Sequence, residues 1–290
     1  MQSQHLIRAA YCAILASLMF ASMSAGVRYA SIYLPNEMNV FLRNIFGLLF
    51  LMPWILSKGI AHMKTRRLRS HLLRSLSGLS AMYCFFYAIA HLDLAEAVLL
   101  NYSSPFFIAL IALVWLGERP SGKLVFAIFL GFIGICFILT PQGSAPNPAA
   151  FVGLLSAFLA ALAMVTIRDL SRTEPTIRIV FYFTTVSTLV SALPLIWAWQ
   201  TPPLTALMVM ALGGLCACFG QLLLTYSYSQ APAAQIGPFT YMSVVFAAMY
   251  GWIFWREILD IYTLIGASLV IIAGSITLHR PSLPPLTEPD

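Results

Sequence analysis

The chain has 290 residues, of which 60% are hydrophobic and only 9% are charged, and its mean hydropathy is +0.86. A soluble domain carries roughly 25% charged residues. This composition therefore cannot build a water-facing surface, and lipid must be the solvent for most of the chain. The net charge of +6 does not indicate a nucleic-acid partner, because the basic residues lie between apolar runs and not along one polar face.

Apolar runs of about 20 residues, the length of a membrane span, recur along the chain between charged residues, prolines and polar clusters. They predict an all-α membrane protein with ten transmembrane helices. The stretch 141–148 is rich in helix breakers and falls at the midpoint of the sequence, so it reads as a loop. The predicted helices are 9–32, 37–57, 72–91, 95–116, 122–140, 150–168, 176–198, 205–229, 233–254 and 261–279.

The basic residues predict how these helices are oriented. With the N-terminus inside, 13 basic residues, Arg74 among them, fall on the cytoplasmic side, and only 2, Arg28 and Arg256, fall outside. This asymmetry follows the positive-inside rule. We therefore expect a multi-pass protein of the bacterial inner membrane with both termini in the cytoplasm.

The two halves of the sequence match each other repeatedly. Helices 1–2 match helices 6–7 at an offset of 140, and helices 3–5 match helices 8–10 at an offset of 139. Five helices per half is an odd number, so the second copy enters the membrane from the opposite side, an arrangement that permits alternating access around a midplane site. We expect a first repeat at 1–140, a linker at 141–149, an inverted repeat at 150–280 and a disordered tail at 281–290. The polar and proline pairs that support this match are Arg28/Arg168, Pro35/Pro175, Tyr87/Tyr226, Tyr102/Tyr241 and Glu118/Glu257.

A local signature runs from the third predicted helix to the end of the fourth. It comprises the tight turn within Tyr87-Ala-Ile-Ala-His-Leu-Asp-Leu-Ala-Glu-Ala97, a proline at Pro105 and the closing Gly117-Glu118. With the ten-helix layout, it resembles the drug/metabolite transporter superfamily, specifically its EamA-type members. The resemblance implies a secondary active transporter with a cavity between helices 1–4 and 6–9, and with helices 5 and 10 more peripheral. The second copy departs from the pattern, because Val244 stands at the counterpart of Pro105 and a proline, Pro238, comes six residues earlier.

Arg43 is the residue that points most directly to a binding site. It lies about 10 Å inside the second predicted helix at a rise of 1.5 Å per residue, where a charge costs about 2.5–3.5 kcal/mol. A cavity-facing position beside a carboxylate, carbonyl groups, water or the anionic part of a substrate would offset that cost. The alternative is a side chain that snorkels to the interface or braces a neighbouring helix.

Aromatic and amide side chains recur on the middle helices and suit a planar or amphipathic solute through stacking, cation–π contacts and hydrogen bonds. Interfacial belts and helix–helix packing are the alternative uses of such tyrosines. Glu96 could exchange protons if it is partly removed from water, or it could complement the helix dipole. The prolines Pro105 and Pro238 could act as hinges or only set a static bend. With Arg43, the predicted substrate-binding residues are Tyr83, Tyr87, Asn101, Tyr102, Gln221, Tyr226, Gln235 and Tyr241.

Other function classes find little support. The sequence contains no zinc-peptidase or Walker A motif, and its cysteines lack metal-ligand spacing, so we expect no catalytic residue, no metal and no cofactor. A channel usually needs a ring of identical filter elements, which two inverted copies do not supply. We expect export of an amino acid or related metabolite, with uptake of a cofactor-like or nucleotide-related solute as the alternative. The expected partners are the small-molecule substrate and membrane lipids, and the expected state is a monomer or weak dimer.

Overall fold

The computed structural model describes residues 2–58, 63–104, 107–108, 111, 122–139, 147–170, 173–230 and 239–278. Within these residues, every one of the ten predicted spans contains helix and no residue lies in a β-strand, which confirms the all-α class. The helices are α1 (Gln2–Ala30), α2 (Asn36–Lys58), α3 (Leu68–His91), α4 (Leu94–Asn101), α6 (Gly122–Leu139), α7 (Pro148–Leu170), α8 (Thr176–Ala192), α9 (Leu195–Ala198), α10 (Leu204–Gln230), α12 (Met242–Tyr250), the π-helical turn η3 (Gly251–Trp255) and α13 (Ile261–Leu278).

Length and hydropathy separate two groups of helices. Among the described residues, α1, α2, α3, α7 and α10 are long and apolar enough to cross a membrane. The shorter apolar helices are α6, α8, the continuous segment of α12 and η3, and α13. The remaining predicted span, the fourth in chain order, is represented by α4, which begins two residues after Leu92 in the tight turn that the sequence predicts.

Proline sets the start of one helix in each half. Pro175, immediately before α8, has extended backbone with φ −65° and ψ 144°. Pro35 precedes α2 at the corresponding position, and its carbonyl accepts the amide of Met38. The Pro175 carbonyl accepts the amide of Arg178 in the same way. Pro35 and Pro175, which match in sequence at the offset of 140, therefore each begin a helix by accepting a backbone hydrogen bond from the residue three positions later.

The packing of the helices is symmetric between the two halves. The first-half helix α1 packs on α10 of the second half, and the corresponding second-half helix α7 packs on α3 of the first half. The contact of α2 with α10 is matched by that of α8 with α3, and the contact of α1 with α12 by that of α7 with α4. Exchanging the halves thus reproduces these principal contacts between the halves, as expected for an inverted repeat.

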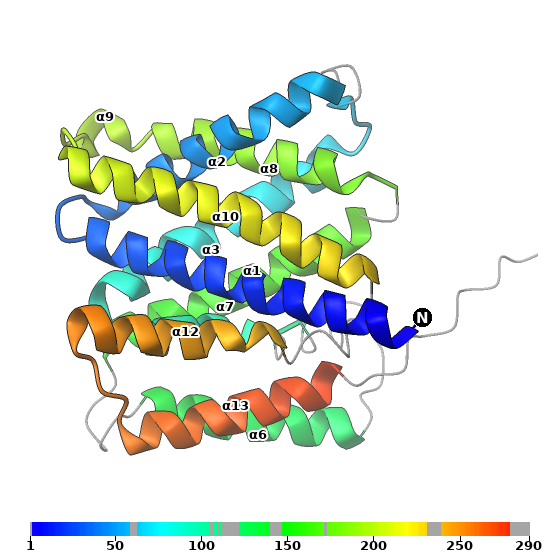
Figure 1. Ribbon diagram of the computed structural model, residues 1–290, viewed down its shortest axis with the longest axis vertical. Coiled ribbons are helices and arrows are strands. Elements are labelled where there is room, and N and C mark those ends of the chain that lie inside the picture. The colour runs from blue at the N-terminus through cyan, green and yellow to red at the C-terminus, as the bar shows by residue number, and fades with distance from the viewer. Residues whose placement is uncertain are drawn as a thin grey trace, which may run out of the picture.

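The helices α6 and α13, the fifth and tenth spans, lie side by side at one edge of the bundle (Figure 1). Glycine allows this approach, because a Cβ on Gly266 would lie 2.6 Å from the carbonyl oxygen of Gly134, and one on Gly134 would lie 2.9 Å from that of Gly266. Small residues at a crossing let helix backbones approach closely in lipid. The other helices form the body of the molecule, which contains the cavity described below.

Candidate functional site

A cavity of about 170 Å³ lies in the body of the bundle. Among the described residues, its walls come from α1, α2, α3, α4 and α10, and none of those that line it belongs to α6 or α13. The volume is below the range of about 300–1,000 Å³ typical of drug-sized ligands, so it fits a small metabolite or one part of a larger one. The lining residues are Phe20, Met23, Arg43, Gly78, Ala81, Met82, Phe85, Phe86, Asn101 and Gln221.

Arg43 brings a positive charge to this cavity from α2 and is only 7% exposed. Its Nη1 donates a hydrogen bond to Oδ1 of Asn44 at 3.1 Å. Its Nε is buried and finds no acceptor among the described residues, and no described carboxylate forms an ion pair with it. A buried charged donor without a partner costs free energy, and an anion in the cavity would offset this cost.

Two amides lie in the same wall. Asn101 ends α4, and its Nδ2 donates to Oγ of Ser156 on α7 at 3.1 Å. Ser156 in turn donates to the carbonyl oxygen of Gly153 at 2.6 Å, so the Asn101 side chain is held in place from a second helix. Gln221 reaches the cavity from α10. With Arg43, three of the sequence-predicted site residues therefore meet in one cavity.

The tyrosines predicted for the site do not line this cavity. Tyr87 is 38% exposed, and its ring stacks on His91 with centroids 4.1 Å apart, while Tyr226 is 47% exposed. Tyr83 packs against the buried core. Tyr102 and Tyr241, which are repeat counterparts, contact each other with ring centroids 5.8 Å apart.

Of the other residues predicted to act in transport, only Glu96 lies among the described residues. Glu96 lies in the first turn of α4 and is half-buried. Gln235, Pro105 and Pro238 lie outside the described residues. Within the described part of the chain, no group of three or more His, Cys, Asp or Glu side chains could hold a metal ion.

Arg74 is a charged residue beside the cavity wall that the sequence analysis did not single out. It counts among the cytoplasmic charges in the topology prediction, because the third helix is predicted to begin at 72, whereas α3 begins at Leu68. Its guanidinium lies against Gly78 of the cavity wall and would collide with any side chain there. Arg43 stands four residues before Gly47 just as Arg74 stands four before Gly78, a repeated Arg-x-x-x-Gly spacing that could have marked both.

A polar cluster joins three elements at the end of the bundle opposite the N-terminus. Arg28 of α1 forms an ion pair with Glu257, which follows η3, and also donates to the carbonyl oxygens of Ile89 and Leu92 in the α3–α4 turn. The amide of Leu94 donates to Glu257 at 2.8 Å. Burial raises the pKa of Glu257, and the Leu94 amide and the Arg28 charge offset part of that rise. The counterparts of this ion pair in the other half, Arg168 and Glu118, have side chains outside the described residues.

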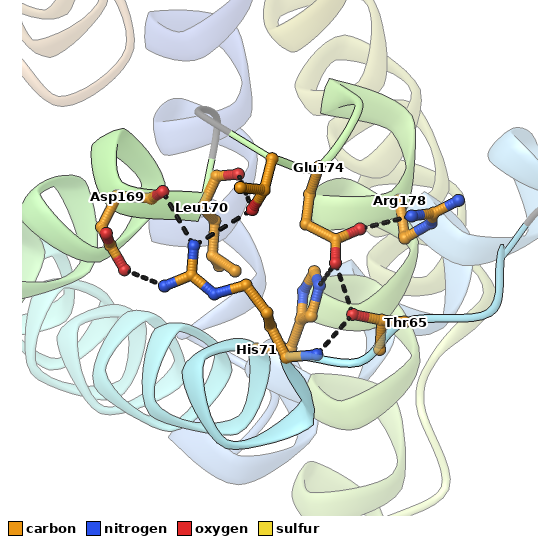
Figure 2. Close-up of polar contacts among 8 residues, drawn as sticks. Thr65, His71, Asp169, Leu170, Glu174 and Arg178 are labelled. Atoms are coloured by element: carbon orange, nitrogen blue, oxygen red, sulfur yellow. Dashed lines mark hydrogen bonds and ion pairs between the residues drawn. The ribbon is translucent and has the colours of Figure 1, made fainter. Parts of the chain in front are cut away.

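A second polar cluster lies at the N-terminal end, where the chain after α2 meets the turn between α7 and α8 (Figure 2). Thr65 donates to Glu174 at 2.6 Å, and Arg178 donates to Glu174 at 2.5 Å. Arg67 forms an ion pair with Asp169. Burial favours the protonated form of Glu174, but the hydrogen bonds from Thr65 and Arg178 and the Arg178 charge together lower its pKa below the ordinary value.

Comparison with known proteins adds the following. The model of the EamA-like transporter family matches residues 7–140 and 147–278. The pseudopaline exporter CntI of Pseudomonas aeruginosa is 38% identical over 272 residues, which cover 92% of this chain and 94% of that protein. A riboflavin transporter of Rhizobium johnstonii is 27% identical over 270 residues, covering 92% of this chain and 89% of that protein. An S-adenosylmethionine uptake transporter of Rickettsia bellii is 26% identical over 239 residues, covering 82% of each protein.

A solved crystal structure shares the fold. It superposes with a TM-score of 0.64 over 92% of this chain and 95% of its own chain, at 16% sequence identity.

Proposed function

Because the chain belongs to the EamA-like transporter family, and is therefore a multi-pass inner-membrane transporter of small molecules and not an enzyme, we propose that it exports a small metabolite that carries an acidic group. Arg43 is the observation that carries this proposal. It places an almost fully buried guanidinium in the cavity, with a free donor and no described carboxylate beside it. A carboxylate or similar anion on the solute supplies the missing acceptor.

Export is favoured by the relative with 38% identity over 92% of this chain, which is a pseudopaline exporter. Pseudopaline, or a compound similar to it, is accordingly the first solute to test. The aromatic residues Phe20, Phe85 and Phe86 in the wall add apolar surface that suits the carbon skeleton of such a solute.

The orientation and the transport cycle belong to the same proposal. The excess of basic residues places the N-terminal end, with the Glu174 cluster, on the cytoplasmic side. The Arg28–Glu257 cluster then closes the outer side, and the two halves exchange roles when the protein opens. The repeat boundaries at 140 and 150, the coupling ion and the monomeric or weakly dimeric state stay predictions.

The test is flux in proteoliposomes that contain the purified protein. Vesicles that contain the protein and are loaded with pseudopaline, or with an extract of bacterial metabolites, are expected to release a specific acidic solute. Release should be faster than from protein-free vesicles with the same load. Comparing imposed pH and charge gradients identifies the driving force. Absence of flux for every acidic metabolite in the extract, in both directions, would refute the proposal.

Uptake of a cofactor-like solute is the alternative, and two relatives support it. The riboflavin transporter and the S-adenosylmethionine uptake transporter are 27% and 26% identical to this chain. Flux of either compound into vesicles, inhibited by an excess of the same compound, would favour this alternative over export.

A further inference from the structure

Asn101 presents a hydrogen-bond acceptor to the cavity. Its side chain lines the cavity at the point where α4 ends, and its Nδ2 donates to Oγ of Ser156 on α7 at 3.1 Å. Asn101 Oδ1 accepts no hydrogen bond from the described residues and keeps accessible surface. This oxygen is therefore available to a donor group of a solute in the cavity.

Ser156 determines which end of the Asn101 amide is turned away from the cavity. The Ser156 hydroxyl has one hydrogen, which it donates to the carbonyl oxygen of Gly153 at 2.6 Å. Its oxygen can then only accept a hydrogen bond from Asn101, so the NH2 group of the amide faces Ser156. Close packing of α7 against α4 keeps the two residues together, because a Cβ on Gly153 would lie 3.1 Å from Cδ1 of Leu100. The orientation of the amide is therefore fixed by a residue that does not itself line the cavity.

The inverted repeat shows that the fold does not need this bond between two side chains. The counterpart of Asn101, at the offset of 139, is Thr240, and the counterpart of Ser156, at the offset of 140, is Ala16. In that half the hydroxyl of the next residue, Ser17, lies 3.2 Å from the backbone carbonyl oxygen of Thr240. The same two helices thus contact each other there without a side-chain amide. A requirement of the duplicated scaffold would apply to both halves, so the oriented amide of Asn101 serves the cavity.

The cavity then offers two chemically different groups. Arg43 supplies a positive charge and donors only, whereas Asn101 supplies an acceptor. An ionised carboxylate accepts hydrogen bonds and cannot donate one, so the acidic group of a solute can satisfy Arg43 but not Asn101. A different part of the solute must supply the donor.

We propose that Ser156 holds the Asn101 amide with its oxygen toward the solute, and that this oxygen accepts a hydrogen bond from an N–H group of the solute. The transported metabolite then carries an N–H donor in addition to its acidic group. Asn101 is a specificity-determining residue in this arrangement, and Ser156 is a positioning residue. The inference rests on the proposed function of the cavity as the substrate site.

The test uses two synthetic probes that share a benzoyl ring and a carboxylate but differ at one position. Hippurate has an amide N–H where benzoylglycolate has an ester oxygen, which cannot donate a hydrogen bond. Binding to the purified full-length protein in detergent is measured by isothermal titration calorimetry. The wild type is expected to bind hippurate at least about fivefold more tightly, because the ester oxygen would face the Asn101 oxygen with no hydrogen between them.

Two variants test the two roles separately. Asn101→Leu removes the acceptor and should reduce the preference for hippurate to about onefold. Ser156→Ala releases the amide, which can then turn its NH2 group toward the ester oxygen, so the preference should fall below about twofold because benzoylglycolate binds more tightly. Structural damage would weaken the binding of both probes, so tighter binding of one probe is a result that misfolding does not produce.

Two controls complete the experiment. Thr166→Val removes another buried hydroxyl of α7 that donates to its own helix, at the carbonyl oxygen of Leu162, and should keep the wild-type preference. Arg43→Gln should weaken both probes by a similar factor, because both carry the same carboxylate, and should also keep the preference. A wild type that binds both probes equally or binds neither, or a preference that survives in Asn101→Leu or in Ser156→Ala, would overturn the inference.

The same measurements separate this inference from the proposed function. If vesicles export an acidic metabolite but the wild type binds both probes equally, the export function stands and the role of Asn101 is refuted. If the preference for hippurate depends on Asn101 and Ser156 but no acidic metabolite is exported, the site stands and the export function fails.

Discussion

Arg43 in the cavity wall and the arginines at the two ends of the bundle differ in their partners. At the ends, Arg28 and Arg67 each form an ion pair with a carboxylate, Glu257 or Asp169. In the cavity, Arg43 has no such partner among the described residues. An arginine with its own carboxylate stabilises a conformation of the protein, whereas one without a carboxylate is available to a ligand. Substitutions at the two places should therefore affect different measurements.

The largest effect is expected when an end pair is broken. Glu257→Gln leaves the Arg28 charge without its counter-ion in a region where the two side chains are only 18% and 9% exposed. Breaking a buried ion pair costs roughly 3–5 kcal/mol, and we expect a loss at the lower end because Arg28 keeps its bonds to backbone carbonyls. Thermal unfolding in detergent measures it. The double variant Arg28→Gln/Glu257→Gln should recover part of the loss, and an equal loss in both proteins would contradict the pairing argument.

Removal of the Arg43 charge from the cavity should reduce export without reducing stability. Arg43→Gln is expected to reduce export about 10- to 100-fold, since a hydrogen bond to a charged group contributes about 1.5–3 kcal/mol. It should leave the unfolding temperature unchanged or raise it, because an uncompensated buried charge is removed. Initial flux rates and thermal unfolding of the same preparation provide both readouts. A large loss of stability would place Arg43 with the structural arginines of the ends.

The Glu174 cluster should respond to acid. A carboxyl whose pKa is lowered by folding contributes stability above its ordinary pKa, about 4.3, and this contribution is lost as the pH falls through the lowered value. The unfolding temperature of the wild type should therefore decrease on the acid side of pH 4. Glu174→Gln should be less stable at neutral pH and show a smaller decrease, and identical pH profiles would contradict the pKa shift of Glu174.

The smallest effect is expected at the exposed pair. The side chains of Arg67 and Asp169 are 32% and 53% exposed, and exposed pairs contribute about 0–1 kcal/mol. Asp169→Asn should lower stability by less than about 0.5 kcal/mol and leave export at the wild-type rate. A substantial loss of flux would show that this pair has a role in closing the N-terminal end that its exposure does not reveal.

The ten-helix fold could be predicted because apolar length and charge boundaries determine it directly. Arg43 could be predicted as a site residue because a charge in the middle of an apolar run needs a special environment. The position of Arg74 beside the cavity wall could not, since the predicted start of its helix is four residues late and a charge near a helix end has an ordinary explanation in topology. For Tyr83 and Tyr87, helical spacing places both on one face of a helix, but it does not say whether that face lies toward the cavity.

The contact between Tyr102 and Tyr241 has a practical consequence for measuring motion. The two residues are counterparts, so an exchange of roles between the halves maps their contact onto itself. Their separation should therefore be the same in the inward-open and outward-open states, whereas the Arg28–Glu257 separation has no such symmetry and should differ between them. A pair of spin labels near Tyr102 and Tyr241 would provide a distance common to both end states as a reference, and a pair near Arg28 and Glu257 would report which side is open.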